Sequence, residues 1–478
     1  MKKKAISMIL LMAMLVSLAA CGGDAGGADT TAADTSADTT AVETAYVDTL
    51  EKRDLGGEEF VIYGQSYTSR QNFYLEEKDG DVCNDAIFKR DLAVEERLNV
   101  DLVFIGEQDR ADVTSKMQAS VLAGSEEYHL FFNAMTHGCN QLTTAGVLYD
   151  LRKIPHLTLE STYWSRWASD CLDINGALYF TSGPISYQFY LTPIVMFFNQ
   201  RLIDEYQLED PYELVLSGKW TAEKMYEMIK DKGQDVNGDN KMDTSDFYGF
   251  ATDSSIGSAL YTAAGIDTVL REDGRLLLTL DSPESIDLIQ TYTTYFGDRT
   301  QVINDVGGKF NPRVEVFEPG RAIFLSTCMI NAIALREMKD DFGILPLPKY
   351  TEEQEHYYST CNTFLPSGVA VPKYCSDPDR TGLVMETMAA YSYDFIRPAT
   401  YEVTLQGKVS RDDETIQMLD IIFEGASYNF IGTFNLSNVG TILTEAVTGD
   451  EKHFASKYAS YSKKAQAQLD EISGFANK

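Results

Sequence analysis

Short apolar runs alternate with amphipathic helical segments at the start of the folded part of the sequence. Strands are expected at 60–64, 100–105 and 129–133, and helices are expected at 84–97 and 111–122. Strands that alternate with helices at this spacing are typical of βαβ units, in which neighbouring strands lie parallel. The sequence therefore predicts an α/β fold.

The same pattern continues further along the chain. Further strands are expected at 177–180, 194–198 and 247–250. Thr221 is expected to cap a helix that reaches Lys230, with Trp220 in the core, because a hydroxyl residue precedes the apolar repeat. Ser282 followed by Pro283 is a second helix start, since serine caps well and proline suits the first turn.

The number of residues argues for more than one core. After the N-terminal segment roughly 430 residues remain, which is too many for a single hydrophobic core. Residues from 379 to the end are expected to be mostly helical, including 412–423. Two lobes are therefore expected, with helices dominating the C-terminal end.

The N-terminus carries the pattern of a bacterial lipoprotein signal. Residues 2–4 are lysines, residues 5–17 are apolar, and Leu-Ala-Ala leads into Cys21. The apolar run is too short to span a bilayer comfortably as a permanent helix. The pattern predicts that the signal peptide 1–20 is removed and that Cys21 is lipidated, which anchors the protein on the extracytoplasmic face of the cell membrane. A plain secretory signal with an incidental cysteine is the alternative.

Residues 21–50 are expected to form a flexible, acidic linker. Most of this segment consists of Gly, Ala, Thr and Asp, and large apolar residues are almost absent. Such a segment cannot bury enough surface to offset the entropy lost on ordering. No later stretch of the sequence is long and apolar enough to predict a transmembrane helix.

The chain is strongly acidic. It has 72 Asp and Glu against 40 Lys and Arg, which gives a net charge of −32. A surface of this charge repels nucleic acids and anionic ligands, so a neutral ligand is favoured and no nucleic-acid partner is expected.

The cysteines other than Cys21 are widely scattered. They form no CxxC pattern and no histidine lies near them at zinc spacing. Buried thiols and disulfides remain equally open for these six residues. They are Cys83, Cys139, Cys171, Cys328, Cys361 and Cys375.

An acidic loop at 235–246, DVNGDNKMDTSD, fits a calcium-binding loop of the EF-hand type. Oxygen-bearing side chains occupy positions 1, 3, 5, 9 and 12, and position 7 can offer its main-chain carbonyl. Position 6 is Asn240 where glycine is usual, although asparagine tolerates the left-handed conformation, and position 12 is Asp where Glu is usual. A structural Ca²⁺ is expected, and a solvated acidic turn that binds nothing is the alternative. The expected ligands are Asp235, Asn237, Asp239, Lys241, Asp243 and Asp246.

Several longer segments resemble the extracellular solute-binding proteins of bacterial ABC sugar importers. They are PIVMFFNQRLIDEYQLEDPYELVLSGKWTAEKMYEMIKD with the acidic loop and DFYGFA after it, FEPGRAIF, DFGILPLPKYTEEQEHYY and VPKYCSDPDRTGLVMETMAAYS. Together with the lipoprotein signal, the similarity covers nearly the whole folded chain. The order of the segments is fairly specific for the family but does not identify the solute.

The resemblance implies a type 2 periplasmic-binding-protein fold. In that fold two α/β lobes are joined by hinge strands and close on a ligand in the cleft between them. The implied N-terminal lobe is 51–190 and 334–374, and the implied C-terminal lobe is 191–333 and 375–478. By analogy with maltose-binding-type proteins, the chain would cross between the lobes near 187–193, 331–338 and 371–375.

Candidate ligand-binding residues come from two rules. In open α/β sheets ligands lie beyond the carboxyl ends of the strands, so polar residues directly after strands are candidates. Sugars stack on aromatic faces and bind planar polar groups through their hydroxyls, so aromatic residues near the first crossing are candidates. Each candidate could equally serve a lobe core or a turn. They are Gln65, Asn133 and Thr136 after strands, and Trp164, Trp167, Tyr187 and Tyr190 among the aromatic residues.

The sequence favours a binding receptor over an enzyme. The expected function is to capture an oligosaccharide or sugar, as a monomer, and to deliver it to the transmembrane permease of an ABC transporter. A binding protein for a peptide or another non-sugar solute is the alternative. A surface-anchored glycoside hydrolase is less favoured: it would need two carboxylates at a defined separation, and no GxSxG, HExxH, phosphate loop or dinucleotide fingerprint occurs.

Overall fold

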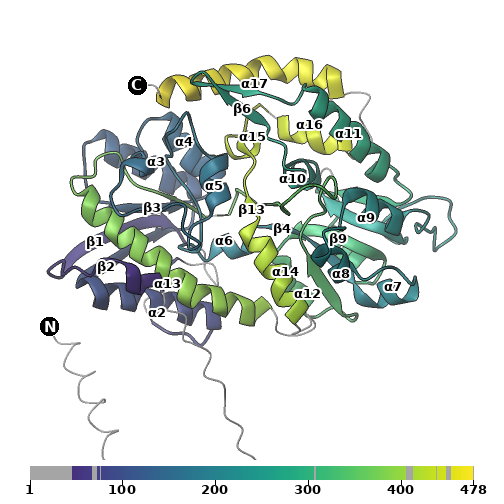
Figure 1. Ribbon diagram of the computed structural model, residues 1–478, viewed down its shortest axis with the longest axis horizontal. Helices are drawn as coiled ribbons and strands as arrows, with labels where there is room; N and C mark the ends of the chain where they lie inside the picture. Colours follow the sequence, from purple (N-terminus) through teal and green to yellow (C-terminus); the bar gives the residue numbers. More distant parts are fainter. Residues whose placement is uncertain are drawn as a thin grey trace, which may run out of the picture. The chain divides into compact units, whose positions relative to one another are not determined.

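A four-stranded, mostly parallel sheet forms the core of the first lobe in the computed structural model (Figure 1). Helices α2 (Val82–Leu98) and α3 (Arg110–Leu122) connect its parallel strands. Each helix begins at an aspartate, Asp81 or Asp109, whose carboxylate accepts hydrogen bonds from the first backbone N–H groups. β1 is parallel to β2 and β3, whereas β12 returns antiparallel to β3. In sheet order the strands are β12 (Gly368–Ala370), β3 (Leu130–Asn133), β1 (Glu58–Gln65) and β2 (Val100–Glu107).

A five-stranded mixed sheet forms the core of the second lobe. Its strands in order are β10 (Phe342–Leu345), β4 (Ile194–Asn199), β9 (Ala322–Cys328), β5 (Tyr248–Asp253) and β8 (Val302–Asp305). β5 is parallel to β8 and β9, and β4 is antiparallel to β9 and β10. The helices of this lobe are α7 (Gln200–Glu205), α8 (Pro211–Leu216), α9 (Ala222–Ile229), α10 (Ile256–Ala263), α11 (Pro283–Phe296) and α12 (Asn331–Leu335).

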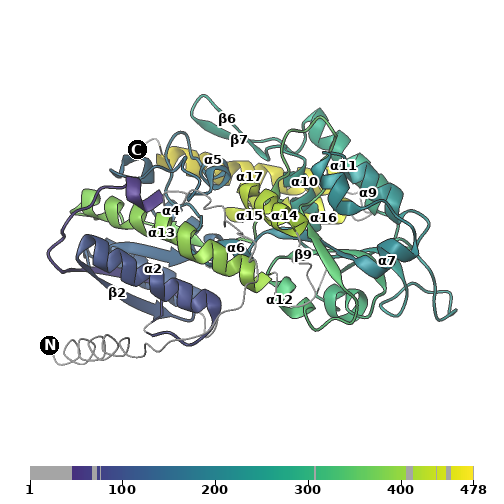
Figure 2. The ribbon, with the colours of Figure 1, turned by 60° about the horizontal axis from the view of Figure 1, so that its bottom comes forward.

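The C-terminal part of the chain is mostly helical, as predicted, and contacts both lobes. α13 (Pro378–Thr404) lies along α2 in the first lobe (Figures 1 and 2). α14 (Asp413–Glu424) packs instead against α8 and β10 of the second lobe. α15 (Phe430–Thr433), α16 (Val439–Glu445) and α17 (Phe454–Ala476) follow.

Shorter elements complete the described chain. A two-stranded parallel ladder joins β11 (Ser359–Thr360) to β13 (Ala426–Ser427), and β6 (Val269–Glu272) forms a hairpin with β7 (Arg275–Leu278). The remaining elements are η1 (Tyr46–Thr49), η2 (Met135–Cys139), α4 (Asn140–Thr144), η3 (Leu151–Lys153), α5 (Arg166–Cys171), α6 (Gln188–Leu191) and η4 (Arg313–Phe317).

The structure describes residues 46–66, 73–75, 77–305, 308–365, 367–404, 413–437, 439–447 and 454–476. The expected signal peptide, Cys21 and most of the expected linker lie outside these residues. Within them, no helix is both long and apolar enough to cross a membrane. No disulfide joins the six cysteines that fall in the described ranges, so the structure favours thiols there.

Most expected elements are confirmed. The hydroxyl of Thr221 accepts a hydrogen bond of 3.1 Å from the amide of Lys224 at the start of α9, and Ser282 caps α11 in the same way. Trp220 is fully buried and donates to the carbonyl of Pro346 at 3.0 Å. The prediction of a strand at 177–180 is wrong, because these residues follow a tight turn and only Ala177 forms a bridge, with Ile174.

The crossings between the lobes differ from the implied ranges after the first one. Along the chain, α6 lies between the strands β1 to β3 of the first sheet and β4 of the second. The range 334–374, implied to belong to the first lobe, is divided, because β10 pairs with β4 whereas β12 pairs with β3. The range 375–478 was implied to belong to the second lobe, but it begins with α13 along α2. The second crossing therefore lies between β10 and β12, and the third lies between α13 and α14.

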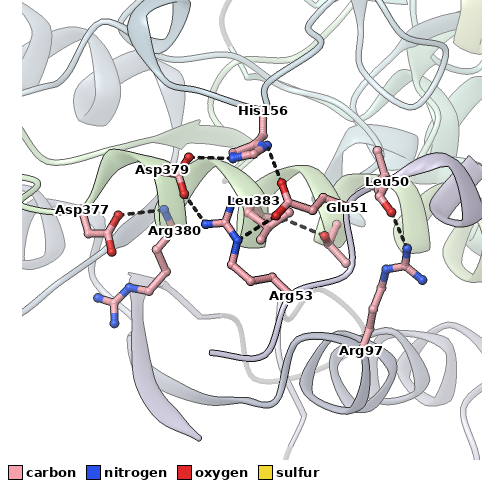
Figure 3. A network of polar contacts seen from close by, with 10 residues as sticks. Leu50, Glu51, Arg53, Arg97, His156, Asp377, Asp379, Arg380 and Leu383 are labelled. Atoms are coloured by element: carbon pink, nitrogen blue, oxygen red, sulfur yellow. Dashed lines mark hydrogen bonds and ion pairs between the residues drawn. The ribbon is translucent and has the colours of Figure 1, made fainter. Parts of the chain in front are cut away.

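The first described residues are fastened to the first lobe, and we call residues 46–53 the strap (Figure 3). The guanidinium of Arg53 donates to Glu51 at 2.9 Å and also bonds Asp379 at the start of α13. His156 lies 2.9 Å from the same Asp379, and Arg97 on α2 donates to the main chain of the strap. Glu51 of the strap also lies 3.8 Å from His156, so the strap joins α2, α13 and the loop before α5, all of them parts of the first lobe.

Candidate functional site

An open hollow lies at the carboxyl ends of the first-lobe strands, and we call it the strand-end hollow. It has a volume of about 740 Å³. Gln65 is the last residue of β1, Arg110 starts α3 after β2, and His137 follows β3. The chain that returns from the second lobe adds Phe364. Ligands of open α/β sheets bind at this edge, so the topology itself makes the hollow a candidate site.

The strand-end hollow presents an aromatic ring beside planar polar groups. Phe364 is 50% exposed, which is unusual for a large apolar side chain. The guanidinium of Arg110 lies 5.9 Å from the centroid of this ring, and the imidazole of His137 lies 5.8 Å from it. An exposed ring can stack on the C–H face of a sugar, while the guanidinium and imidazole can bond its hydroxyls.

Gln65 holds an unsatisfied polar atom in the same hollow. Its amide nitrogen donates to the carbonyl of Gln108 at 3.1 Å, but its buried Oε1 has no hydrogen-bond partner among the described residues. A buried acceptor without a donor costs about 1–3 kcal/mol. A hydroxyl donor from a ligand or a water would remove that cost, so Gln65 remains a candidate ligand-binding residue.

Asn133 and Thr136 support the hollow from beneath instead of lining it. Asn133 is fully buried, and its amide nitrogen donates to Thr114 at 2.9 Å. The hydroxyl of Thr136 pairs with that of Thr363 at 2.6 Å. A Cβ at Gly138 would come within 2.9 Å of the Asn133 amide, so the turn that carries His137 packs directly on this side chain.

The expected aromatic residues gather elsewhere, in a partly open pocket that we call the aromatic cavity. It has a volume of about 600 Å³ and is lined by Trp164, Trp167 and Tyr190 among others. Tyr187 is buried and is not among the lining residues. The strand-end hollow and the aromatic cavity share no lining residue, so the structure separates the predicted ligand-binding residues into two groups. A smaller cavity of about 290 Å³ also borders Trp167.

Polar side chains mark the corresponding strand ends of the second lobe. Thr327 near the end of β9 donates to Asp253 at the end of β5 at 3.1 Å, and Asn331 donates to Thr327 at the same distance. Neither this group nor Arg110 was predicted from the sequence, although the strand-end rule applied to β2, β5 and β9 selects both. Phe364 carries no such signal, because it reaches the hollow only through the second crossing.

The acidic loop folds tightly on its own main chain. Both carboxylate oxygens of the buried Asp246 accept backbone N–H groups, from Val236 and Asp243, each at 2.9 Å. Asp235 accepts from two backbone amides of the loop in the same way. Asn240 has φ 61°, so the left-handed conformation expected at position 6 is present. Among the described residues, no three His, Cys, Asp or Glu side chains converge closely enough to hold a metal ion.

Comparisons with known proteins agree with this architecture. No protein-family model and no curated protein sequence matches the chain. A cyclo/maltodextrin-binding protein in complex with maltotetraose is 13% identical with a TM-score of 0.57, over 86% of this chain and 96% of that one. A family 1 extracellular solute-binding protein from Bifidobacterium longum subsp. infantis is 13% identical with a TM-score of 0.52, over 88% of this chain and 100% of that one.

An ABC substrate-binding protein from Listeria monocytogenes in complex with cycloalternan is similar as well. It is 14% identical with a TM-score of 0.50, over 88% of this chain and 99% of that one. All three are named as binding proteins and none as an enzyme. The chain therefore has the two-lobed α/β fold of extracellular solute-binding proteins, as the resemblance implied.

Proposed function

We propose that this protein is a lipid-anchored extracytoplasmic receptor that captures a sugar in the strand-end hollow and delivers it to an ABC transporter permease. The observation that carries the proposal is the group of Gln65, Arg110, His137 and exposed Phe364 at the carboxyl ends of parallel strands. It combines one stacking face with planar hydrogen-bonding groups, which is the chemistry that a sugar ring requires.

The net charge of −32 supports an uncharged ligand. A strongly acidic surface lowers the local concentration of anions but leaves neutral solutes unaffected. The solved structures with similar folds are named as complexes with maltotetraose and cycloalternan, which are uncharged sugars. A peptide or another non-sugar solute is the runner-up ligand, because peptides also stack on aromatic rings.

Capture rests on bending at the crossings between the lobes. A ligand in the strand-end hollow that also reaches the Asp253, Thr327 and Asn331 group would touch both lobes. Such a ligand binds the closed form more tightly than the open form, and this difference in affinity shifts the equilibrium toward the closed form. The closed form then presents both lobes to the permease.

We also propose that the acidic loop binds a structural Ca²⁺. Asp235, Asn237, Asp239, Asp243 and Asp246 would supply side-chain oxygens, with the carbonyl of residue 241 in addition. Hard Ca²⁺ takes six to eight oxygen ligands, and this loop offers such a set within one short segment. The ion would hold the connection between α9 and β5 and would take no part in sugar binding.

The proposed function is tested by thermal unfolding of the full-length protein in detergent against maltose, maltotetraose, cycloalternan, simple hexoses and short peptides. A sugar at about 100 times its Kd should stabilise the protein by about 2.7 kcal/mol. Arg110→Ala should weaken that sugar by about tenfold or more, because it removes a charged hydrogen-bond donor. Lys89→Ala, at an exposed position on α2, is the matched control.

The alternatives give different results. Stabilisation by peptides alone would make the protein a peptide receptor. If Arg110→Ala bound the sugar with unchanged affinity, the sugar would not bind in the strand-end hollow. Release of an aryl group from aryl glycosides would show that the protein is an enzyme.

A further inference from the structure

The aromatic cavity is large enough and apolar enough to hold a small ligand. Its volume of about 600 Å³ falls within the range of small-molecule sites. Tyr190 packs edge-to-face on Phe423 at 5.0 Å and on Phe189 at 5.3 Å between ring centroids, so these three rings form one continuous part of the wall. Six of the rings that line it are Trp164, Trp167, Phe189, Tyr190, Tyr393 and Phe423.

Tyr190 offers an unused hydrogen-bonding group at this cavity. Its side chain is 1% exposed, and its buried hydroxyl has no partner among the described residues. Buried polar atoms are nearly always paired, so an orphan hydroxyl on a cavity wall points to a missing donor or acceptor. Burial also raises the pKa of Tyr190, so the hydroxyl keeps its proton.

The charged groups at the cavity disfavour an anionic occupant. Its two arginines already have carboxylate partners: Arg397 donates to Asp420 at 2.5 Å, and the guanidinium of Arg166 lies 3.7 Å from Asp170. Glu160 and Glu424 are exposed at the cavity and form no ion pair in the described part of the chain. Free carboxylates repel anions and accept hydrogen bonds from hydroxyl groups.

Both lobes contribute walls to the aromatic cavity. Residues 160–167 and Tyr393 on α13 belong to the first lobe, and α6 lies at the first crossing. Phe423 lies on α14, which packs on the second lobe. The ion pair between Arg397 and Asp420 connects α13 to α14 at this point. A ligand in the cavity therefore contacts two helices that lie on opposite sides of the third crossing.

We propose that the aromatic cavity is a second sugar-binding site, which takes one uncharged sugar ring and is separate from the strand-end hollow. The ring would stack on the indole of Trp167, and its hydroxyls would bond the hydroxyl of Tyr190 and the free carboxylates. The ligand class rests on the proposed function, but the location does not, because the two sites share no residue.

The test is equilibrium dialysis of radiolabelled methyl α-D-glucopyranoside, methyl β-D-galactopyranoside and methyl β-D-xylopyranoside with the full-length protein in detergent. At least one of these glycosides should bind at two sites. Arg110→Ala should leave one site, Trp167→Ala should leave the other, and the double variant should leave none. Tyr374→Ala, an aromatic residue that is 48% exposed outside both sites, is the matched control.

Two further measurements test the second site even if Trp167→Ala folds poorly. Tyr190→Phe removes one oxygen that has no partner, so it should fold normally and weaken the second site about threefold to tenfold. Tryptophan fluorescence reports the same site, because two of the three tryptophans line the cavity and Trp220 is buried in the second lobe. A saturable change in emission should therefore persist in Arg110→Ala.

The outcomes separate this proposal from the proposed function. Loss of all binding in Arg110→Ala, with no fluorescence change left, would overturn the second site and leave the receptor function intact. If Trp167→Ala lost all binding while Arg110→Ala bound as the wild type does, the aromatic cavity would remain a site. The role of the strand-end hollow would then be overturned. No binding of any of the three glycosides would also overturn the second site.

Discussion

The indole Nε1 of Trp164 donates a hydrogen bond of 2.8 Å to Oε2 of Glu386 on α13. Glu386 is 1% exposed, and its other oxygen accepts from the hydroxyl of Tyr163 at 2.8 Å and from the amide of Thr158 at 3.1 Å. One buried carboxylate thus holds the loop that carries Trp164 into the wall of the aromatic cavity. No cationic side chain pairs with it in the described ranges.

Glu386→Leu should destabilise the protein by roughly 3–5 kcal/mol, because it leaves several buried donors without an acceptor. Urea unfolding followed by circular dichroism measures this change. Glu402→Leu alters an exposed residue of the same helix and should stay within about 0.5 kcal/mol of the wild type. Equal effects of the two substitutions would contradict the role of Glu386.

Removal of calcium tests the acidic loop. Chelation should lower the unfolding midpoint of the wild type, and added Ca²⁺ should restore it, since an ion that binds only the folded state stabilises that state. Asp239→Asn should weaken this response about tenfold, because it removes one charge from the ligand set and keeps the carbonyl oxygen. Asp101→Asn, on the exposed face of β2, is the control. If neither the chelator nor added Ca²⁺ changed the unfolding midpoint, the loop would be a solvated turn that binds no ion.

The strap should be released when its ion pairs are broken. Asp379→Asn weakens the bonds to Arg53 and His156, so trypsin should cut after Lys52 and Arg53 several times faster than in the wild type. Mass spectrometry of the fragments measures the rate, and Glu59→Gln at a nearby exposed position is the control. Unchanged cleavage would mean that the strap is held by other contacts.

Acid should release the strap as well. The hydrogen bonds from Arg53 hold the pKa values of Glu51 and Asp379 below their usual ranges. A carboxyl with a lowered pKa in the folded state stabilises the docked strap above its ordinary pKa and loses that effect as the pH falls through the lowered value. Pepsin should therefore cut within the strap at about pH 3, and docking should be complete above about pH 5.

Replacement of Cys21 tests the anchor. Cys21→Ser removes the thiol that would carry the diacylglyceryl group, so the protein should move from the membrane fraction to the soluble fraction of its bacterial host. Immunoblotting of the two fractions measures the change, and Cys375→Ser is a control within the fold. A variant that still sediments with membranes would show that lipidation of Cys21 is not the anchor.

The periodic part of the fold was predictable from the sequence. The first lobe follows from runs of apolar residues whose helices start at capping aspartates, and α9 and α11 follow from Thr221 and Ser282. The error at 177–180 has a local cause. Asn175 and Gly176 have φ of 54° and 89°, so the chain turns back on itself there, and an Asn-Gly pair is the usual signal of such a turn.

The candidate site was only partly predictable. The strand-end rule selects Gln65, which lines the strand-end hollow. The same rule selects Asn133, but the side chain of Asn133 points into the protein and bonds Thr114. Trp164, Trp167 and Tyr190 do gather around one cavity, yet nothing in the sequence shows that α14 closes it. Phe364 and Phe423 reach their places through the second and third crossings, and such contacts between distant segments leave no periodic pattern.

The strap bonds α2 and α13, and its Glu51 lies 3.8 Å from His156 in the loop before α5; each of these parts packs in the first lobe. For a chain tethered through residues that precede the strap, any pull from the membrane reaches the first lobe directly. The second lobe receives that pull only through the crossings. Because the linker expected at 21–50 is flexible, the tether would limit how far the first lobe can move from the bilayer without fixing its orientation. On closure, the second lobe would then move relative to the lobe that carries the tether.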